Sequence, residues 1–127
     1  MCGFVGFVNN SLSDDKHESE CLGVLKKMTD SIAHRGPDAE NFYHDENVSL
    51  GFRRLAFIDV HGLTSPLPNE DKSKIILFNG EIYNFQDLRQ ELVAKGYKFI
   101  THGDAEVLLH GYSEWGAELL QKVRGMF

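Results

Sequence analysis

The first two residues, Met1 and Cys2, are the first candidates for chemistry in this chain. Cellular processing readily removes a methionine before a small residue, and its removal makes Cys2 the N-terminal residue. A free α-amine has a pKa near 8 and a thiol one of about 8.5, so such a cysteine carries both a nucleophile and its own base. The alternative is that Cys2 is only a small hydrophobic residue of a buried strand, and position alone does not decide between the two.

A second candidate is the pair Asn79-Gly80, which lies within the run Phe78 to Asn84. The side-chain amide of Asn79 and the backbone N–H of Gly80 are two donors at one place, as an oxyanion hole requires. Glycine also leaves room for a substrate to approach. For an isolated Asn-Gly pair the favoured interpretation is a hairpin turn, so this signal also needs support from elsewhere.

Three charged residues predict a binding site for an amino acid. Arg53 and Arg54 are adjacent within an apolar strand pattern, so their side chains point to opposite faces. One is expected in solvent, and the other can present its guanidinium to a carboxylate. Asp104 either caps a helix or accepts from an ammonium group. A carboxylate binder with an ammonium binder suits an α-amino acid, although spacing does not decide which arginine takes part.

The elements that position these residues alternate between strand and helix patterns, which predicts an α+β fold. The loop from His34 to Asp38 is interpreted as structural, because Arg35 and Asp38 can pair and brace a neighbouring loop. Cys21 is expected in the core. Strands are predicted over Phe4–Val8, 42–43, Val48–Ile58, Ile75–Phe78 and Tyr97–Ile100, and helices over Glu18–Ala33, from an Asn84 cap to Gly96, from an Asp104 cap to Gly116, and over 117–123.

Composition excludes several classes of function. The 127 residues predict one domain, and the net charge of −6 disfavours nucleic-acid and membrane partners. No apolar stretch approaches 18 residues, so no spanning helix is expected. Two cysteines form no disulfide framework, which favours the cytoplasm. The six histidines lack the spacings of zinc ligands, and no metal site is predicted.

Together and in this order, the motifs resemble the N-terminal glutaminase domains of glutamine-hydrolysing asparagine synthetases. These domains are class II glutamine amidotransferases with an N-terminal-nucleophile hydrolase fold, an αββα sandwich. The Arg-Arg-Leu strand and the Asn-Gly-Glu-Ile-Tyr-Asn run are typical of the asparagine-synthetase branch. The matching pieces span the chain: Met1 to Gly3, His34 to Asp38, Arg53 to Leu55 with Ile58-Asp59, Asn79 to Asn84, Gly103 to Glu106, and Arg124 to Phe127.

The resemblance implies a role for each matching residue. Cys2, freed of Met1, is the nucleophile, and Asn79 with Gly80 forms the oxyanion hole. Arg54, which directly precedes Leu55 in the motif, holds the α-carboxylate of glutamine. The other implied contacts to glutamine are Asp104 and Glu81 on the α-amino group, with Gly80 nearby, and the backbone around Phe57 and Ile58, which frames the pocket.

The resemblance also implies a larger protein. Glutaminase domains of this family run on beyond 127 residues, so residues 1–127 are expected to be a partial, C-terminally truncated domain. The domain needs no cofactor of its own. ATP and magnesium belong to a second, synthetase domain, which amidates aspartate with the released ammonia. The protein is expected in the cytoplasm, with a homodimer as one possible assembly.

Two alternatives to this function stay open at the level of sequence. The first is an amidotransferase of the same branch with another acceptor, such as a sugar acid in polysaccharide synthesis. The second is a catalytically silent regulatory module that keeps the fold. Retention of Met1 favours this second alternative, because a blocked amine cannot act as a base.

Overall fold

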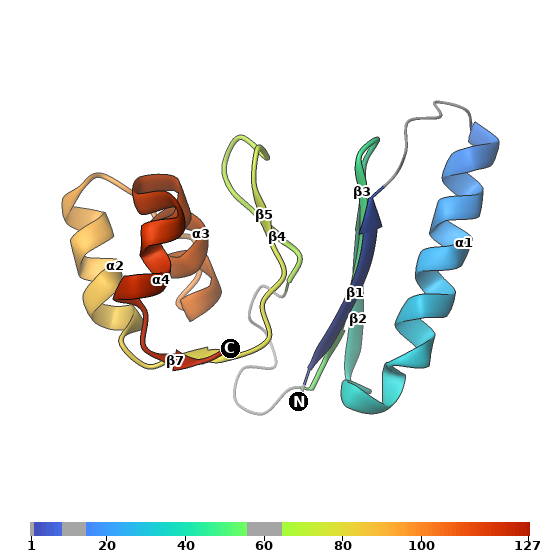
Figure 1. Ribbon diagram of the computed structural model, residues 1–127, viewed down its shortest axis with the longest axis horizontal. Helices are drawn as coiled ribbons and strands as arrows, with labels where there is room; N and C mark the ends of the chain where they lie inside the picture. The colour runs from blue at the N-terminus through green and yellow to red at the C-terminus, as the bar shows by residue number, and fades with distance from the viewer. Residues whose placement is uncertain (1, 9–14, 56–64) are drawn as a thin grey trace. The chain divides into compact units, whose positions relative to one another are not determined.

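The computed structural model describes residues 2–8, 15–55 and 65–127, without the side chains of 15–17. The chain divides into two compact units, Met1–Val60 and His61–Phe127. Each unit contains both helices and strands, so the predicted α+β character is confirmed (Figure 1). Among the described helices, none combines the length and the apolar composition needed to cross a membrane.

The first unit is an antiparallel sheet with a helix on one face (Figure 1). Its strands have the spatial order β1-β3-β2, so the two later strands form a hairpin and the first strand pairs with the outer side of β3. The elements in chain order are β1 (Gly3–Val8), α1 (Asp15–Ser31), the 3₁₀ turn η1 (Ala33–Arg35), β2 (Ala39–His44) and β3 (Val48–Arg54).

Helix α1 forms because apolar residues recur along one side of it, and that side packs on the sheet. Leu25 and Thr29 are fully buried there. A Cβ on Gly51 of β3 would lie 2.2 Å from Thr29 Oγ1, so only glycine allows the helix to approach this closely. The opposite face of the sheet carries apolar side chains that are exposed, with Phe4 53% and Val8 75% accessible. One face of the sheet is therefore covered by α1 and the other is apolar.

The second unit packs helices α2 (Phe85–Ala94), α3 (Asp104–Trp115) and α4 (Leu119–Lys122) around a shared core. Glycines with positive φ, Gly96 and Gly116, follow α2 and α3, as the sequence predicts for helix ends. Two small antiparallel sheets complete the unit: β4 (Leu67–Pro68) with β5 (Ile75–Ile76), and β6 (Glu81–Ile82) with β7 (Gly125–Met126). The 3₁₀ turn η2 (Gly116–Glu118) joins α3 to α4. The core consists of Ile82, Leu88, Leu92, Val107, Leu108 and Leu119.

The strand predicted over Tyr97–Ile100 is wrong. The backbone N–H groups of Ile100 and Thr101 donate instead to the carboxylate of Glu106, over 2.8 and 2.6 Å. The two aromatic residues of this segment, Tyr97 and Phe99, pack on the helical core, whereas Ile100 is exposed.

Two other predicted strands are shorter than expected. The strand predicted over Ile75–Phe78 is regular only at Ile75–Ile76, and the N–H of Phe78 donates to Ser65 Oγ at 3.2 Å. Strand β3 ends at Arg54, so Leu55 of the predicted range is not part of it, and positions 56–58 lie outside the described residues.

Candidate active site

Cys2 is held at the end of the first unit's sheet by contacts from two other segments. Its Sγ accepts a hydrogen bond from the backbone N–H of Leu55 at 3.3 Å, and Sγ lies 3.8 Å from the carbonyl oxygen of Leu55. The carbonyl oxygen of Cys2 accepts from Arg35 Nε at 3.2 Å. The thiol is thus fixed in place and half-buried rather than frayed.

The strand register places Cys2 beside Arg54. Gly3 of β1 pairs with Arg53 of β3 in an antiparallel ladder, so one step further along the register sets Cys2 opposite Arg54. Two of the residues singled out from the sequence therefore meet at one end of one sheet, although they are 52 positions apart in the chain.

The two adjacent arginines have different environments. Arg53 points to the face covered by α1, where its guanidinium pairs with Asp30 at 2.6 Å and Glu40 at 2.7 Å. Its Nε also donates to the carbonyl oxygen of Thr29 at 3.1 Å, and its side chain is only 12% exposed. Arg53 is therefore an internal structural cation rather than a solvated one. Strand alternation directs Arg54 to the opposite face.

The loop after α1 braces this end of the sheet, and the pairing of Arg35 with Asp38 stays a prediction. A Cβ on Gly36 would lie 2.5 Å from the carbonyl carbon of Arg53, so glycine is needed for the loop to pass over β3. The N–H of Asp38 donates to the carbonyl oxygen of Arg54 at 3.1 Å. Arg35 also donates to the carbonyl oxygen of Cys2, so the loop contacts both candidate site residues of this unit, Cys2 and Arg54.

In the second unit, Asn79 and Gly80 do not form the hairpin turn that the pair suggests. Neither residue has a positive φ, which a two-residue Asn-Gly hairpin turn requires. They lead directly into β6, and a Cβ on Gly80 would lie 2.4 Å from the carbonyl oxygen of Met126 in β7. The side chain of Asn79 makes no hydrogen bond to the residues that the structure describes. This amide is therefore available to a ligand.

Asp104 lies next to the same segment. It is the first residue of α3, with Gly103 in the N-cap position, so it does not cap the helix as one interpretation of the sequence expects. Its Oδ2 accepts from the N–H of Ile82 at 2.8 Å, and within the described part of the chain Oδ1 has no hydrogen bond. Within the described part of the chain, Asp104 thus keeps one carboxylate oxygen without a hydrogen bond. The residue that its other oxygen contacts, Ile82, is two positions after Gly80.

Asn84 also differs from the sequence prediction. It occupies the N-cap position of α2, but its side chain does not bond to that helix. Its Nδ2 donates to the carbonyl oxygen of Lys122 at 2.9 Å, and its Oδ1 accepts from the N–H of Arg124 at 2.8 Å. Asn84 therefore holds the chain that leads into β7 against β6.

The predicted site residues thus form two local groups. Cys2 and Arg54 meet in the first unit, whereas Asn79, Gly80 and Asp104 meet in the second. The side chain of Glu81 is exposed beside them. Phe57 and Ile58, expected to frame the pocket, lie outside the described residues.

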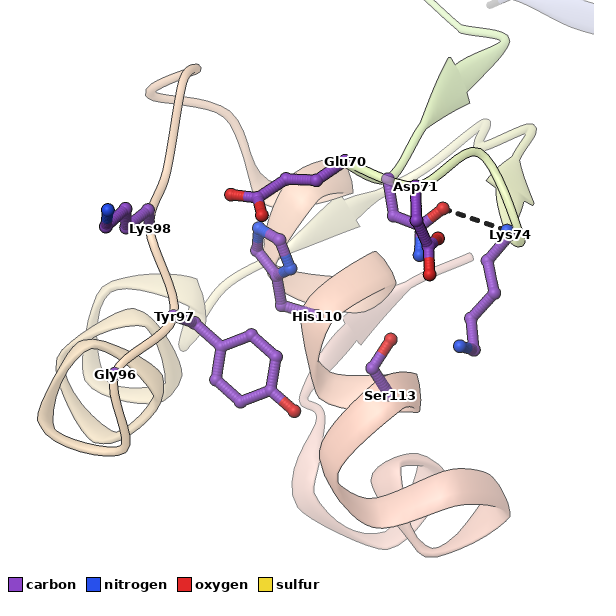
Figure 2. Close-up of a pocket in the computed structure, with 9 residues that line it drawn as sticks. Glu70, Asp71, Lys74, Gly96, Tyr97, Lys98, His110 and Ser113 are labelled. Carbon is purple, nitrogen blue, oxygen red and sulfur yellow. Dashed lines mark hydrogen bonds between the residues drawn. The ribbon is translucent and has the colours of Figure 1, made fainter.

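A cavity of about 380 Å³ in the second unit contains none of the predicted site residues (Figure 2). Figure 2 shows Tyr97 beside His110, with the Glu70 carboxylate directed toward the histidine ring and Lys98 directed away from it. The lining mixes both signs of charge: Asn69, Glu70, Asp71, Lys74, Gly96, Tyr97, Lys98, His110 and Ser113. Over the ranges that the structure describes, no group of three or more His, Cys, Asp or Glu side chains is arranged to hold a metal.

Sequence reasoning missed two residues that support the site. The contact of Leu55 with Cys2 is made by a backbone N–H, which leaves no trace in residue type. Glu106 was noted only as part of a motif, yet its carboxylate binds the segment before Asp104. Its position three residues after the helix N-cap is a signal that could have indicated such a role.

Comparison with known proteins places this arrangement in a class. Residues 1–127 match the glutamine amidotransferase domain family over the whole chain, and the chain belongs to that family. It is 49% identical over 128 residues to asparagine synthetase [glutamine-hydrolyzing] 1 of Bacillus subtilis, covering all of this chain and 20% of that protein. It is 37% identical over 127 residues to asparagine synthetase [glutamine-hydrolyzing] 1 of Arabidopsis thaliana, covering all of this chain and 21% of that protein. The chain thus spans about a fifth of the length of these relatives.

Proposed function

We propose that the chain hydrolyses glutamine to glutamate and ammonia with Cys2 as the nucleophile. The observation that carries this proposal is the placement of Cys2 in a member of the amidotransferase family, where Leu55 fixes its sulfur and Arg35 its carbonyl oxygen. The reaction requires that Met1 be removed, so that the α-amine of Cys2 is free to accept the thiol proton.

The reaction has two stages. The Cys2 sulfur attacks the side-chain amide carbon of glutamine, and the Cys2 amine takes the thiol proton. The C–N bond then breaks, the nitrogen takes that proton and leaves as ammonia, and a glutamyl thioester remains. Water attacks the thioester and releases glutamate and the free thiol. Asn79 Nδ2 and the Gly80 N–H stabilise the oxyanion in both stages.

Glutamine is recognised by its two α-substituents in this proposal. Arg54 binds the α-carboxylate, supported by its place beside Cys2 and by the engagement of Arg53 with Asp30 and Glu40. Asp104 binds the α-ammonium group through Oδ1, supported by the bond that fixes its Oδ2 to Ile82. Glu81 is the second acceptor for the ammonium group, and Phe57 and Ile58 frame the pocket.

We further propose that the fold is the αββα sandwich of N-terminal-nucleophile hydrolases. Support comes from the first unit, where α1 covers one face of the sheet and the other face is apolar at Phe4 and Val8. A second sheet on that face would bury these side chains.

The ammonia is proposed to pass to a synthetase domain of the same polypeptide, which amidates aspartate with ATP and magnesium. The support is the printed names of the relatives, glutamine-hydrolysing asparagine synthetases, of which this chain spans about a fifth. A cytoplasmic setting fits a reactive thiol, because a reducing compartment keeps it free. The homodimer stays a prediction.

The test compares two activities of the full-length protein. Cys2→Ala is expected to abolish ammonia release from glutamine and to leave synthesis from added ammonia intact. If Cys2→Ala abolishes both activities, the proposal that Cys2 serves only the glutaminase reaction is wrong. If the full-length protein amidates a carboxylic acid other than aspartate, the proposed glutaminase function stands and the proposed acceptor is wrong.

A further inference from the structure

Glu106 is a buried carboxylate that the proposed reaction does not use. Its exposed fraction is 3%, and it accepts three hydrogen bonds. The N–H of Ile100 donates to Oε1 at 2.8 Å, and the N–H and hydroxyl of Thr101 both donate to Oε2 at 2.6 Å. An ionised group at this depth is tolerated only when it is fully engaged in this way.

These bonds fix the segment that leads into α3. Glu106 is the third residue of that helix, and Asp104 is the first. Residues 100 and 101 pair with none of the described strands, so Glu106 takes the place of a sheet partner for their N–H groups. The carbonyl oxygen of Thr101 is held from the other side by Arg89 Nη1 at 2.8 Å, and the Arg89 guanidinium lies 4.3 Å from the centre of the Phe99 ring.

The charge of Glu106 is maintained by its surroundings. Burial raises the pKa of this carboxyl, but the bonds from Thr101 and Ile100, together with the imidazole of His110, hold the pKa below its ordinary value. His110 Nε2 lies 3.4 Å from Glu106 Oε1. The group that binds the 100–101 segment is therefore an anion, and its bonds are stronger than those of a neutral amide.

We propose that Glu106 is a positioning residue that gives the site its selectivity for the α-ammonium group of glutamine, acting through Asp104. The inference rests on the proposed function. Asp104 can present Oδ1 at a fixed point only if the first turn of α3 is fixed. Its Oδ2 bond to Ile82 constrains the side chain, and the Glu106 anchor constrains the backbone that carries it.

The test uses the full-length protein with two substrates, glutamine and glutaramate, which lacks the α-amino group. Selectivity is the ratio of their kcat/KM values for ammonia release. In Glu106→Gln the new NH₂ group faces donors of Thr101, so the anchor is broken while size is kept. We expect this ratio to fall about tenfold, through a higher KM for glutamine and with little change in kcat.

Four further variants make the result specific. Glu114→Gln is the matched control, because Glu114 is also an ion-paired residue of α3 but bonds to Lys95 and Tyr97. It is expected to leave the ratio unchanged. Asp104→Asn combined with Glu106→Gln is expected to lower the ratio no further than Asp104→Asn alone. Thr101→Val removes only the hydroxyl bond and is expected to give a smaller loss of selectivity, even where Glu106→Gln fails to fold.

The outcomes separate this inference from the function on which it rests. An equal fall in activity toward both substrates in Glu106→Gln or Thr101→Val, with the ratio intact, would overturn the positioning role and leave the glutaminase standing. A wild-type protein that releases no ammonia from glutamine would overturn the proposed function itself.

Discussion

The backbone N–H of Leu55 donates a hydrogen bond to Cys2 Sγ, joining two residues 53 positions apart in the chain. In the proposed reaction the nucleophile is thereby oriented by backbone groups at the end of β3 rather than by a histidine side chain. A backbone donor survives substitution by any residue other than proline, and it does not change its charge with pH. The base in this account is the Cys2 amine, so the thiol needs orientation more than it needs a separate partner.

Substitutions of the two arginines are expected to affect different properties, substrate binding for Arg54 and stability for Arg53. Arg54→Lys is expected to raise the KM for glutamine about tenfold while stability stays close to wild type, because lysine cannot form the two parallel bonds to a carboxylate. Arg53→Lys is expected to lower the midpoint of thermal unfolding by roughly 5 °C and to leave the KM nearly unchanged. Glutaminase kinetics and thermal melts measure both effects. The reverse assignment, with Arg53 controlling the KM, would contradict the site.

Gly80→Ala is expected to destabilise the protein by about 2 kcal/mol and to lower glutaminase activity, because a Cβ there would lie 2.4 Å from the carbonyl oxygen of Met126. Gly23→Ala is the matched control. A Cβ on Gly23 meets no atom within 4 Å, and alanine favours the helix, so stability should rise by about 0.5–1 kcal/mol. Denaturant unfolding distinguishes the two. A neutral Gly80→Ala would mean that β7 does not pack there.

Asn84→Ala is expected to loosen the segment that enters β7. It removes bonds to the carbonyl oxygen of Lys122 and to the N–H of Arg124, at a cost of about 1 kcal/mol. Hydrogen exchange at Arg124 should accelerate. Asn69→Ala removes a comparable pair of bonds, to Ser73 and Lys74, and should leave exchange at Arg124 unchanged. Equal exchange in both variants would refute the role of Asn84.

Stability is expected to decrease in acid partly through Glu106. Its folded-state pKa lies below the ordinary value of 4.5, so its contribution is fully present above that pH. The contribution is lost as the pH falls from 4.5 through the folded-state pKa. Glu106→Gln should therefore be less stable than wild type near neutral pH, and the difference should shrink in acid. A difference independent of pH would show that folding does not lower the pKa of Glu106.

Local patterns predicted the three longer helices, because each carries its own apolar face and two of them end at glycine. The strand over Tyr97–Ile100 was predicted wrongly for a related reason. Aromatic and β-branched residues favour a strand, but here the aromatic side chains pack on helices and Ile100 is exposed. The N–H groups at 100 and 101 went to a side chain on the following helix, which strand propensity does not describe.

The candidate site was likewise predictable only in part from the sequence. Residue types singled out Cys2, Asn79, Asp104 and a pair of arginines, and the match to the family motif chose Arg54 from that pair. The contacts that orient them could not be predicted, since Leu55 acts through its backbone and Ile82 through an N–H. Such contacts depend on the register between segments distant in sequence, which no single stretch of the chain records.

The most direct test of the central claim is to incubate the full-length protein with a glutamine-mimicking electrophile and to locate the adduct by peptide mass spectrometry. The account predicts one adduct, on Cys2, in a peptide that has lost Met1, and none on Cys21, which is buried. Excess glutamine should protect Cys2 from the reagent. A peptide that retains Met1 and yet reacts at Cys2, or a mature Cys2 that stays unmodified, would contradict the N-terminal nucleophile.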